Sequence, residues 1–236
     1  MTYQSYNDMR SVVTQLWLSD KYAEAFEILS KEAPAYPDRH HDTLYYSMCL
    51  NSRMGKVDAA VEFLREAIED VGHWYGESQL LETDEDLTNI WENAEFQRLR
   101  SISLARAAEA EATAKPLHLV EQPTNTDGKL PLVLALHGNT GNAETTLGRW
   151  KPIVEEDYLL VALQSTQLSG PNAYVWNNFE KAKAELIDHY AALTAKYDID
   201  TERVVIGGFS MGGGFALWAA LNDVIPVKGY LGIGPY

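Results

Sequence analysis

The residues best suited to chemistry are a serine set between glycines in residues 208–212, which read Gly-Phe-Ser-Met-Gly. They fit the pattern G-x-S-x-G, in which a serine hydroxyl acts as a nucleophile from a strained turn between a strand and a helix. An apolar strand candidate (203–206) leads into the motif, and an apolar helix candidate (212–221) leads out of it. The outer glycines let the strand and the helix come close together. The pattern therefore predicts that Ser210 is a catalytic nucleophile.

This glycine-rich segment has three other interpretations besides a nucleophile. A phosphate-binding loop is excluded because no Gly-Lys-Ser or Gly-Lys-Thr follows the glycines. A dinucleotide-binding loop is excluded because G-x-G-x-x-G is not formed in register. A glycine-rich turn with an incidental serine stays open as the structural alternative.

A second element supports the same chemistry. The apolar strand candidate 130–136 ends in His137 and Gly138, followed by a loop of small residues. Such a loop supplies one main-chain donor of an oxyanion hole, and the residue after the nucleophile supplies the other. We expect these donors to be the N–H groups of Met211 and Asn139. Gly138 lets the main chain turn in close, and the position of His137 on an earlier strand predicts that it braces the loop.

Together these segments resemble the carboxylesterase/phospholipase branch of the α/β-hydrolases, which includes acyl-protein thioesterases and dienelactone-hydrolase-like esterases. The resemblance covers about residues 117–236 and rests on Leu-His-Gly at 136–138, Gln-Ser-Thr-Gln at 164–167, Trp176, and the glycine-rich motif at 207–213. It implies a soluble serine hydrolase of carboxylic esters or thioesters that uses no metal or other cofactor. It also implies that Trp176 and Gln164 line the substrate site. A packed loop aromatic is the alternative for Trp176.

The sequence departs from this family after the nucleophile. The catalytic order in the fold is Ser, then Asp or Glu, then His, but no histidine follows Ser210 and Asp223 is the only later carboxylate side chain. We expect the acid and the base beyond residue 236, so that this chain alone is a weak catalyst. A fragment of a longer hydrolase and a degenerate homologue both remain open. An apolar sheet edge exposed at 231–233 favours the fragment.

His189 is the internal histidine that might be taken for the missing base. It falls within an amphipathic helix candidate at 180–196. A histidine on the helix surface, or one that lines the packing, is the simpler interpretation. We therefore do not assign His189 to catalysis.

The chain divides into two parts by its patterning. Residues 115–236 are predicted to form an α/β domain, with strands at 117–120, 130–136, 158–163, 203–206 and 228–233 and helices at 180–196 and 212–221. Strands without polar alternation, separated by helices, predict a doubly wound, mostly parallel sheet covered on both faces. The resemblance implies that this is an incomplete α/β-hydrolase sheet, cut after the strand that follows the nucleophile.

Residues 1–114 are predicted to be helical throughout, including a long helix over 91–114. A faint internal repeat places Ala25 and Leu29 in the same pattern as Ala60 and Leu64. The offset is close to the period of about 34 residues of tetratricopeptide helix pairs. The region is therefore interpreted as a tetratricopeptide-like domain, with helical hairpins that match the repeat by chance as the alternative.

Composition bounds the partners. With 19 Lys and Arg against 34 Asp and Glu, the formal charge of −15 argues against nucleic acid as a ligand. The sequence shows no membrane span and no secretory leader, so a cytoplasmic location is expected. The only cysteine, Cys49, lies in an apolar helical stretch and is predicted to be a buried thiol.

Two functions of different classes follow from these patterns. The first is a serine hydrolase with a small-molecule ester or thioester substrate. The second is a non-catalytic interaction module, in which the helical repeats bind a protein partner and the hydrolase-like half is a scaffold. A peptidase of the same fold is a third option, because fold and nucleophile do not fix the acyl substrate.

Overall fold

The computed structural model describes residues 3–76, 81–124 and 128–235. The chain forms two compact units, Met1–Ala108 and Glu109–Tyr236. Each unit is described by itself.

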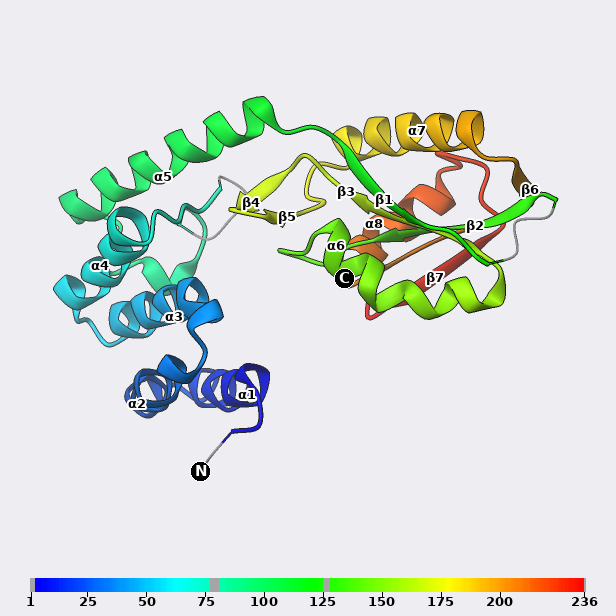
Figure 1. Cartoon of the computed structure of the whole chain (residues 1–236). Helices are drawn as coiled ribbons and strands as arrows, with labels where there is room; N and C mark the ends of the chain where they lie inside the picture. The colour runs from blue at the N-terminus through cyan, green and yellow to red at the C-terminus, as the bar shows by residue number, and fades with distance from the viewer. Residues whose placement is uncertain (1–2, 77–80, 125–127, 236) are drawn as a thin grey trace. The chain divides into compact units, whose positions relative to one another are not determined.

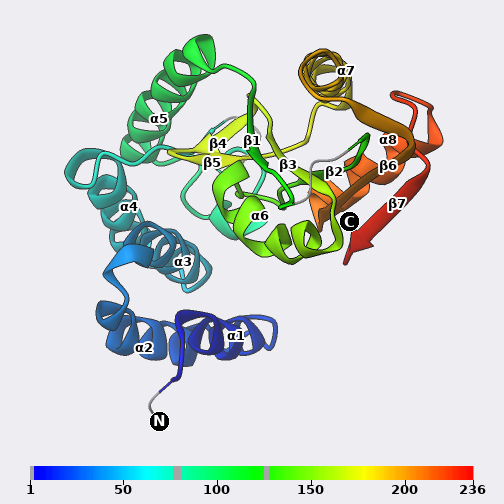
Figure 2. The same ribbon diagram turned by 45° about the vertical axis from the view of Figure 1, so that its right-hand side comes forward.

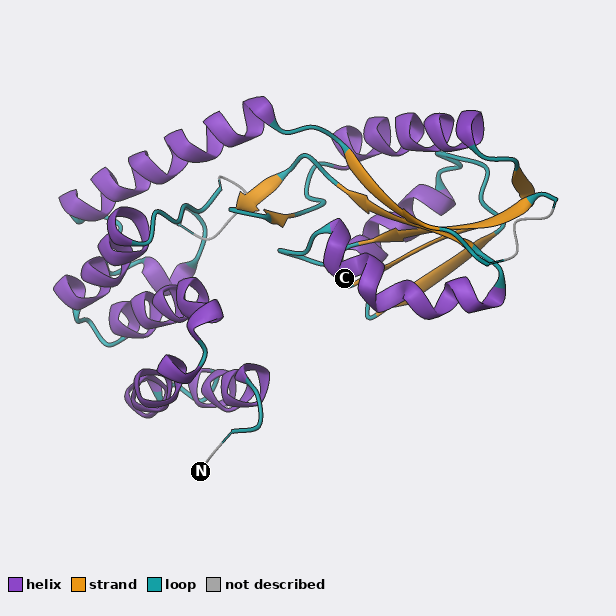
Figure 3. Ribbon diagram, in the orientation of Figure 1, coloured by secondary structure: helices purple, strands orange, loops and turns teal. Residues whose placement is uncertain are grey.

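The described part of the first unit consists of helices, as the sequence predicts (Figure 3). Its α-helices are α1 (Tyr6–Trp17), α2 (Tyr22–Glu32), α3 (His40–Arg53), α4 (Val57–Arg65) and α5 (Ala94–Thr113), the last of which runs into the second unit. Short turns of other helical types are η1 (Ala33–Ala35), η2 (Pro37–Arg39), the π-helical η3 (Glu66–Asp70) and η4 (Glu85–Leu87).

Helix α5 begins later than the predicted residue 91. The side-chain oxygen of Asn93 accepts hydrogen bonds from the N–H groups of Glu95 at 2.9 Å and Phe96 at 3.1 Å. An Asn side chain in this role satisfies donors that have no partner within the helix. The cap therefore fixes the first helical residue at Ala94, and residues 91 and 92 lie in a turn.

The repeated positions are equivalent in burial. Ala25 and Ala60 are both fully buried, and Leu29 and Leu64 are each 1% exposed, on α2 and α4 respectively. A small residue followed four positions later by a large one lets a second helix approach the same face. The tetratricopeptide-like interpretation itself stays a prediction. Cys49 is buried in this unit, as expected.

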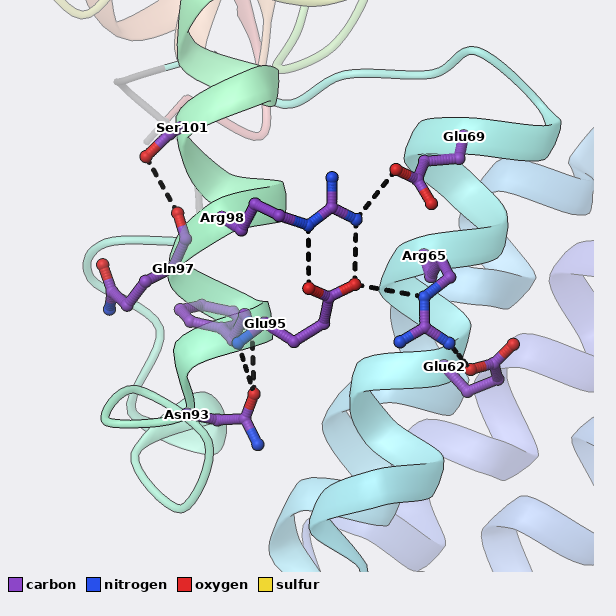
Figure 4. A network of polar contacts seen from close by, with 9 residues as sticks. Glu62, Arg65, Glu69, Asn93, Glu95, Gln97, Arg98 and Ser101 are labelled. Carbon is purple, nitrogen blue, oxygen red and sulfur yellow. Dashed lines mark hydrogen bonds and ion pairs between the residues drawn. The ribbon is translucent and has the colours of Figure 1, made fainter.

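A network of charged side chains connects α4 and η3 to α5 (Figure 4). Glu95 accepts two hydrogen bonds from Arg98, at 2.7 and 2.8 Å, and a third from Arg65 at 3.2 Å. Arg98 also donates to Glu69 at 2.8 Å, and Arg65 donates to Glu62. The Arg98 guanidinium lowers the pKa of Glu95 to about 2. The network thus holds two helices of the unit together by a shared carboxylate.

The second unit is built on a five-stranded sheet in the order β1-β3-β2-β6-β7 (Figure 1). Only β1 runs antiparallel to its neighbour, so the sheet is mostly parallel, as predicted. The strands of this sheet are β1 (Leu117–Glu121), β2 (Leu130–Leu136), β3 (Leu159–Gln164), β6 (Ile199–Phe209) and β7 (Gly229–Ile233). A separate hairpin is formed by β4 (Leu168–Gly170) and β5 (Ala173–Tyr174).

Helices cover the sheet on both faces (Figure 2). One face packs against α7 (Phe179–Lys196) and α8 (Met211–Leu221), with Leu134 and Phe215 among the buried residues. The opposite face packs against α6 (Ala143–Trp150) and η5 (Lys151–Glu156), with Ala135 and Trp150 in contact. All seven residues of β2 are buried, which accounts for its lack of polar alternation.

Two parts of this unit lie outside the prediction. Helix α6 was not expected, although Asn142 is a recognisable cap whose side chain accepts from the N–H of Thr145 at 2.9 Å. The β4–β5 hairpin was not expected either, because its strands are three and two residues long and give no periodic signal. Among the helices of the described residues, none combines the length and the apolar character that crossing a membrane requires.

Candidate functional site

Ser210 lies at the corner between β6 and α8. The strand ends at Phe209 and the helix begins at Met211, while Ser210 itself has φ 49° and ψ −121°. A positive φ is uncommon for a residue with a Cβ and marks local strain. The Ser210 N–H donates to the carbonyl of Ile233 at 2.9 Å, and its half-buried side chain makes no capping bond to α8. The hydroxyl therefore projects from a strained turn at the carboxyl edge of the sheet.

Main-chain contacts at two glycines close this corner. A Cβ placed on Gly208 would lie 2.5 Å from the carbonyl carbon of Gly212. A Cβ placed on Gly212 would lie 2.1 Å from the carbonyl oxygen of His137. No side chain fits at such distances. The corner is thus packed directly against the end of β2, and both predicted glycine roles have a geometric reason.

His137 is buried and neutral beside the corner. Its Nδ1 lies 2.9 Å from the carbonyl oxygen of Gly138, so Nδ1 must carry the proton that is donated. Its Nε2 then accepts from the N–H of Ser165 at 3.5 Å. Burial lowers the pKa of His137 to about 4. Both ring nitrogens are engaged in holding two loops, which is a bracing arrangement.

The loop after β2 follows the corner closely. A Cβ on Gly138 would lie 2.7 Å from the ring of Phe209, the residue before the nucleophile. Asn139 comes next in the chain with an exposed side chain, and Thr140 has a positive φ of 56°. Met211 is the first residue of α8, where an N–H has no acceptor within the helix. The two residues predicted to supply oxyanion donors thus follow directly on Gly138 and Ser210, which both lie next to Phe209.

Trp176 connects the loop to the corner. Its indole Nε1 donates to the carbonyl of His137 at 3.0 Å, and its main-chain N–H contacts the sulfur of Met211 at 3.3 Å. The ring stacks on His137 at 4.7 Å between centroids and on Phe215 at 5.4 Å. At 2% exposure, Trp176 is a packed aromatic that also lies next to the candidate site. The two interpretations of this residue are therefore compatible.

Gln164 has a different neighbourhood from the other candidate residues. It ends β3 and is 8% exposed. Its Oε1 accepts from the N–H of Ala143 at 3.2 Å, in the first turn of α6. The side chain therefore ties β3 to the start of α6, and its role as a substrate-lining residue stays a prediction.

The other titratable candidates lie away from Ser210. His189 is buried, and its Nδ1 lies 2.9 Å from Nδ1 of His118 on β1, so it does not lie on the helix surface. His118 lies on the edge strand β1, which is separated from β6 by β3 and β2, so these two strands are about 14 Å apart. Asp223 follows the end of α8, about 17 Å along the helix from Ser210. Within the described ranges, no three His, Cys, Asp or Glu side chains group as metal ligands.

A buried acid near the site escaped the sequence analysis. Glu185 on α7 is 7% exposed and accepts hydrogen bonds from Thr166, in the loop that follows β3. The only signal was its helical spacing from Ala182 and His189, which are also buried, and such spacing alone does not separate it from a surface acid. The polar run at 164–167 is visible in the sequence, but nothing in the run indicates that Glu185 is its partner.

Comparison with known proteins gives a family match for the helical region. Residues 5–111 match the family model described as the A/B hydrolase-like, N-terminal domain. No curated protein matches the chain.

Several solved structures are similar to the chain. An uncharacterized protein from Bacillus cereus ATCC 10987 is 26% identical with a TM-score of 0.45, over 99% of this chain and 74% of that one. The Bacillus cereus carboxylesterase is 19% identical with a TM-score of 0.42, over 55% and 64% of the two chains. A bacterial heroin esterase is 22% identical with a TM-score of 0.41, over 59% and 52%. The matched region thus spans about half to three quarters of the length of these proteins.

The family match and the observed sheet agree with the predicted fold class, an α/β unit preceded by a helical region. Residues 5–111 are thus similar to the A/B hydrolase-like, N-terminal domain, and in this chain the matched region precedes a mostly parallel α/β sheet.

Proposed function

We propose that this chain carries the nucleophile of a serine hydrolase that cleaves carboxylic esters or thioesters. One observation supports it most strongly: Ser210 occupies a strained strand-to-helix corner whose glycines bring the main chain against the end of β2. An incidental serine in a glycine-rich turn has no need of a positive φ or of such close packing. This geometry supports the interpretation of residues 208–212 as a nucleophile elbow.

The proposed reaction proceeds through an acyl-enzyme. The Ser210 oxygen forms a bond to the acyl carbon, and the negative charge on the carbonyl oxygen is stabilised by the N–H groups of Met211 and Asn139. Collapse of this intermediate expels the alcohol or thiol, which takes up the proton lost by the serine. Water then attacks the acyl-enzyme and releases the acid. Each oxyanion donor is worth about 10²–10³ in turnover.

The base and the acid of this mechanism are proposed to lie beyond residue 236. Internal candidates are poorly placed for these roles. His137 is committed to Gly138 and Ser165, and His189 pairs with His118 on β1, the edge strand that β3 and β2 separate from β6. A base must come within about 3 Å of the hydroxyl whose proton it takes.

A fluorophosphonate probe tests the nucleophile directly. The full-length product of the gene is incubated with the probe, and the modified residue is identified by peptide mass spectrometry. We expect an adduct on Ser210 that disappears in Ser210→Ala. The exposed Ser101 serves as the control, since Ser101→Ala should leave labelling unchanged. A folded full-length protein without an adduct on Ser210 would refute the proposal and favour the interaction module.

A panel of simple compounds tests whether the protein cleaves esters, thioesters or amides. p-Nitrophenyl acetate, an acyl thioester and a peptide anilide share a scissile acyl group but differ in the leaving group. Turnover of the first two without the third supports the proposed class. Turnover of the anilide at a comparable rate would assign the protein to the peptidases of this fold instead.

A further inference from the structure

Glu185 is a buried carboxylic acid with no partner of opposite charge in direct contact in the described structure. It lies on α7, where it is 7% exposed, and both of its oxygens lie 3.3 Å from the N–H of Thr166. Its Oε1 also accepts from the Thr166 hydroxyl. Burial raises the pKa of Glu185, and the two Thr166 donors oppose that rise. Burying a carboxylic acid costs free energy of folding unless it is hydrogen-bonded. The pairing of Glu185 with Thr166 therefore suggests that the acid has a role at this position.

The residues on either side of Thr166 hold the loop that follows β3 against residues 175–178. On one side of Thr166, the Ser165 hydroxyl donates to the carbonyl of Val175 at 2.5 Å. On the other side, the carbonyl of Gln167 accepts from the N–H of Val175 at 2.9 Å. The side chain of Gln167 also forms two bonds with the main chain of Asn178, at 2.7 and 3.1 Å. Residues 165–167 thus hold the segment 175–178 at four points.

The clamped segment carries Trp176. The indole of Trp176 holds the carbonyl of His137, and its main-chain N–H contacts the sulfur of Met211. Nε2 of His137 in turn accepts from the N–H of Ser165, so this series of contacts leads back to the loop that follows β3. The acid on α7 is therefore linked by consecutive contacts to the main chain of His137, at the end of β2, and to the side chain of Met211, the residue after Ser210.

We propose that Glu185 is a positioning residue, which fixes residues 165–167 and through Trp176 sets the geometry of the donors around Ser210. This inference rests on the proposed function of Ser210. Glu185 touches no reacting atom, so its effect on the reaction is transmitted through the loops. Catalytic groups must be held close to their productive positions, and hydrogen bonds from residues behind them provide that support.

The test compares two substitutions of the acid in the full-length protein. Glu185→Leu fills a similar volume but removes both acceptors, which leaves the N–H and hydroxyl of Thr166 without them. Glu185→Gln keeps an oxygen facing the same donors. Glu180→Leu is the matched control, since it makes the same chemical change at an exposed position of α7. Two readings are taken: the second-order rate of fluorophosphonate labelling at Ser210, and amide hydrogen exchange in 165–168 and 174–178.

We expect Glu185→Leu to slow labelling by about tenfold or more and to speed exchange in both segments. Glu185→Gln should stay within about threefold of the original rate, and Glu180→Leu should match it. Thr166→Val, which removes the hydroxyl donor alone, should have an intermediate effect and serves if Glu185→Leu does not fold.

The inference is overturned by labelling at the original rate in folded Glu185→Leu, or by unchanged exchange in the two segments. A Glu185→Gln protein as slow as Glu185→Leu also overturns it, because the retained acceptor should rescue the rate. If the original protein takes no label, the proposed function fails by itself. The exchange measurement then still decides whether Glu185 holds the loops.

Discussion

Replacing Gly212 with alanine is the most direct perturbation of the corner at Ser210. The added Cβ would lie 2.1 Å from the carbonyl oxygen of His137 and 2.8 Å from that of Leu136. Both atoms belong to the main chain of β2 or the residue after it, so no side chain can rotate away. Because carbon–oxygen contacts normally lie at about 3.3 Å, α8 or the end of β2 must move by more than about 1 Å.

The free-energy cost follows from that displacement. Overpacking a well-filled interior costs about 1–3 kcal/mol, and more where main chain must shift. Alanine recovers up to about 1 kcal/mol in a helix, since Gly212 lies within α8. Because main chain must shift, we take the upper end of that range, about 3 kcal/mol, less about 1 kcal/mol, and expect a net loss of about 2 kcal/mol in the free energy of unfolding of the second unit. With a urea dependence of about 1–3 kcal/mol per molar, the unfolding midpoint should fall by roughly 1 M.

Urea unfolding, read by hydrogen exchange of peptides from β2 and β6, confines the measurement to the second unit. Gly148→Ala is the matched control, because Gly148 also lies in a helix but a Cβ there meets no atom within 4 Å. That variant should be unchanged or slightly more stable. If Gly212→Ala unfolds at the same urea concentration as the original protein, the argument from main-chain packing is refuted.

Two further predictions concern titration. Because the pKa of His137 is lowered to about 4, its imidazole should stay neutral and protonated on Nδ1 down to about pH 4, as NMR of the ring nitrogens would show; an ordinary titration near pH 6.5 would contradict this. Stability from this residue should fall by on the order of 3 kcal/mol as pH drops from about 6.5 to 4, since the unfolded chain protonates first. Because the pKa of Glu95 is lowered to about 2, the stability that Glu95 contributes relative to Glu95→Gln should be present above pH 4.5 and lost toward pH 2. The measurement compares the urea unfolding midpoints of the original protein and Glu95→Gln. A difference between these midpoints that stays constant from pH 4.5 to pH 2 would argue against the network of Figure 4.

The elements of the α/β unit were predictable where burial alone decides the pattern. Strand β2 is apolar at every position because both of its faces are covered, and its predicted bounds match the structure. The short hairpin β4–β5 was not predictable, since three and two residues carry no period. Helix α6 was not predicted, although Asn142 is a residue type that commonly caps the start of a helix. The position of the boundary between the two domains, predicted after residue 114, stays a prediction.

The candidate site was predictable only to the extent that it is made of main chain. Glycines at 138, 208 and 212 are required by contacts of 2.1–2.7 Å, so their presence in the sequence indicates where segments meet. The contacts of Gln164 with α6 and of His189 with β1 depend on which strands are neighbours. Local spacing does not contain that information. Glu185 belongs to the same class, because its partner lies 19 positions away in the sequence.

The candidate site around Ser210 should be rigid before any substrate binds. Donors that stabilise a developing oxyanion act best when they need no rearrangement at the moment of reaction. Around Ser210 the geometry is set by main-chain contacts at Gly212 and by a neutral His137 that holds two loops, rather than by flexible side chains. Charging His137 would cost the bond to Ser165, because Nε2 could no longer accept. Burial of the His137 imidazole therefore helps to fix the positions of the two loops beside Ser210. The proton transfer of the proposed reaction must be assigned to a different residue.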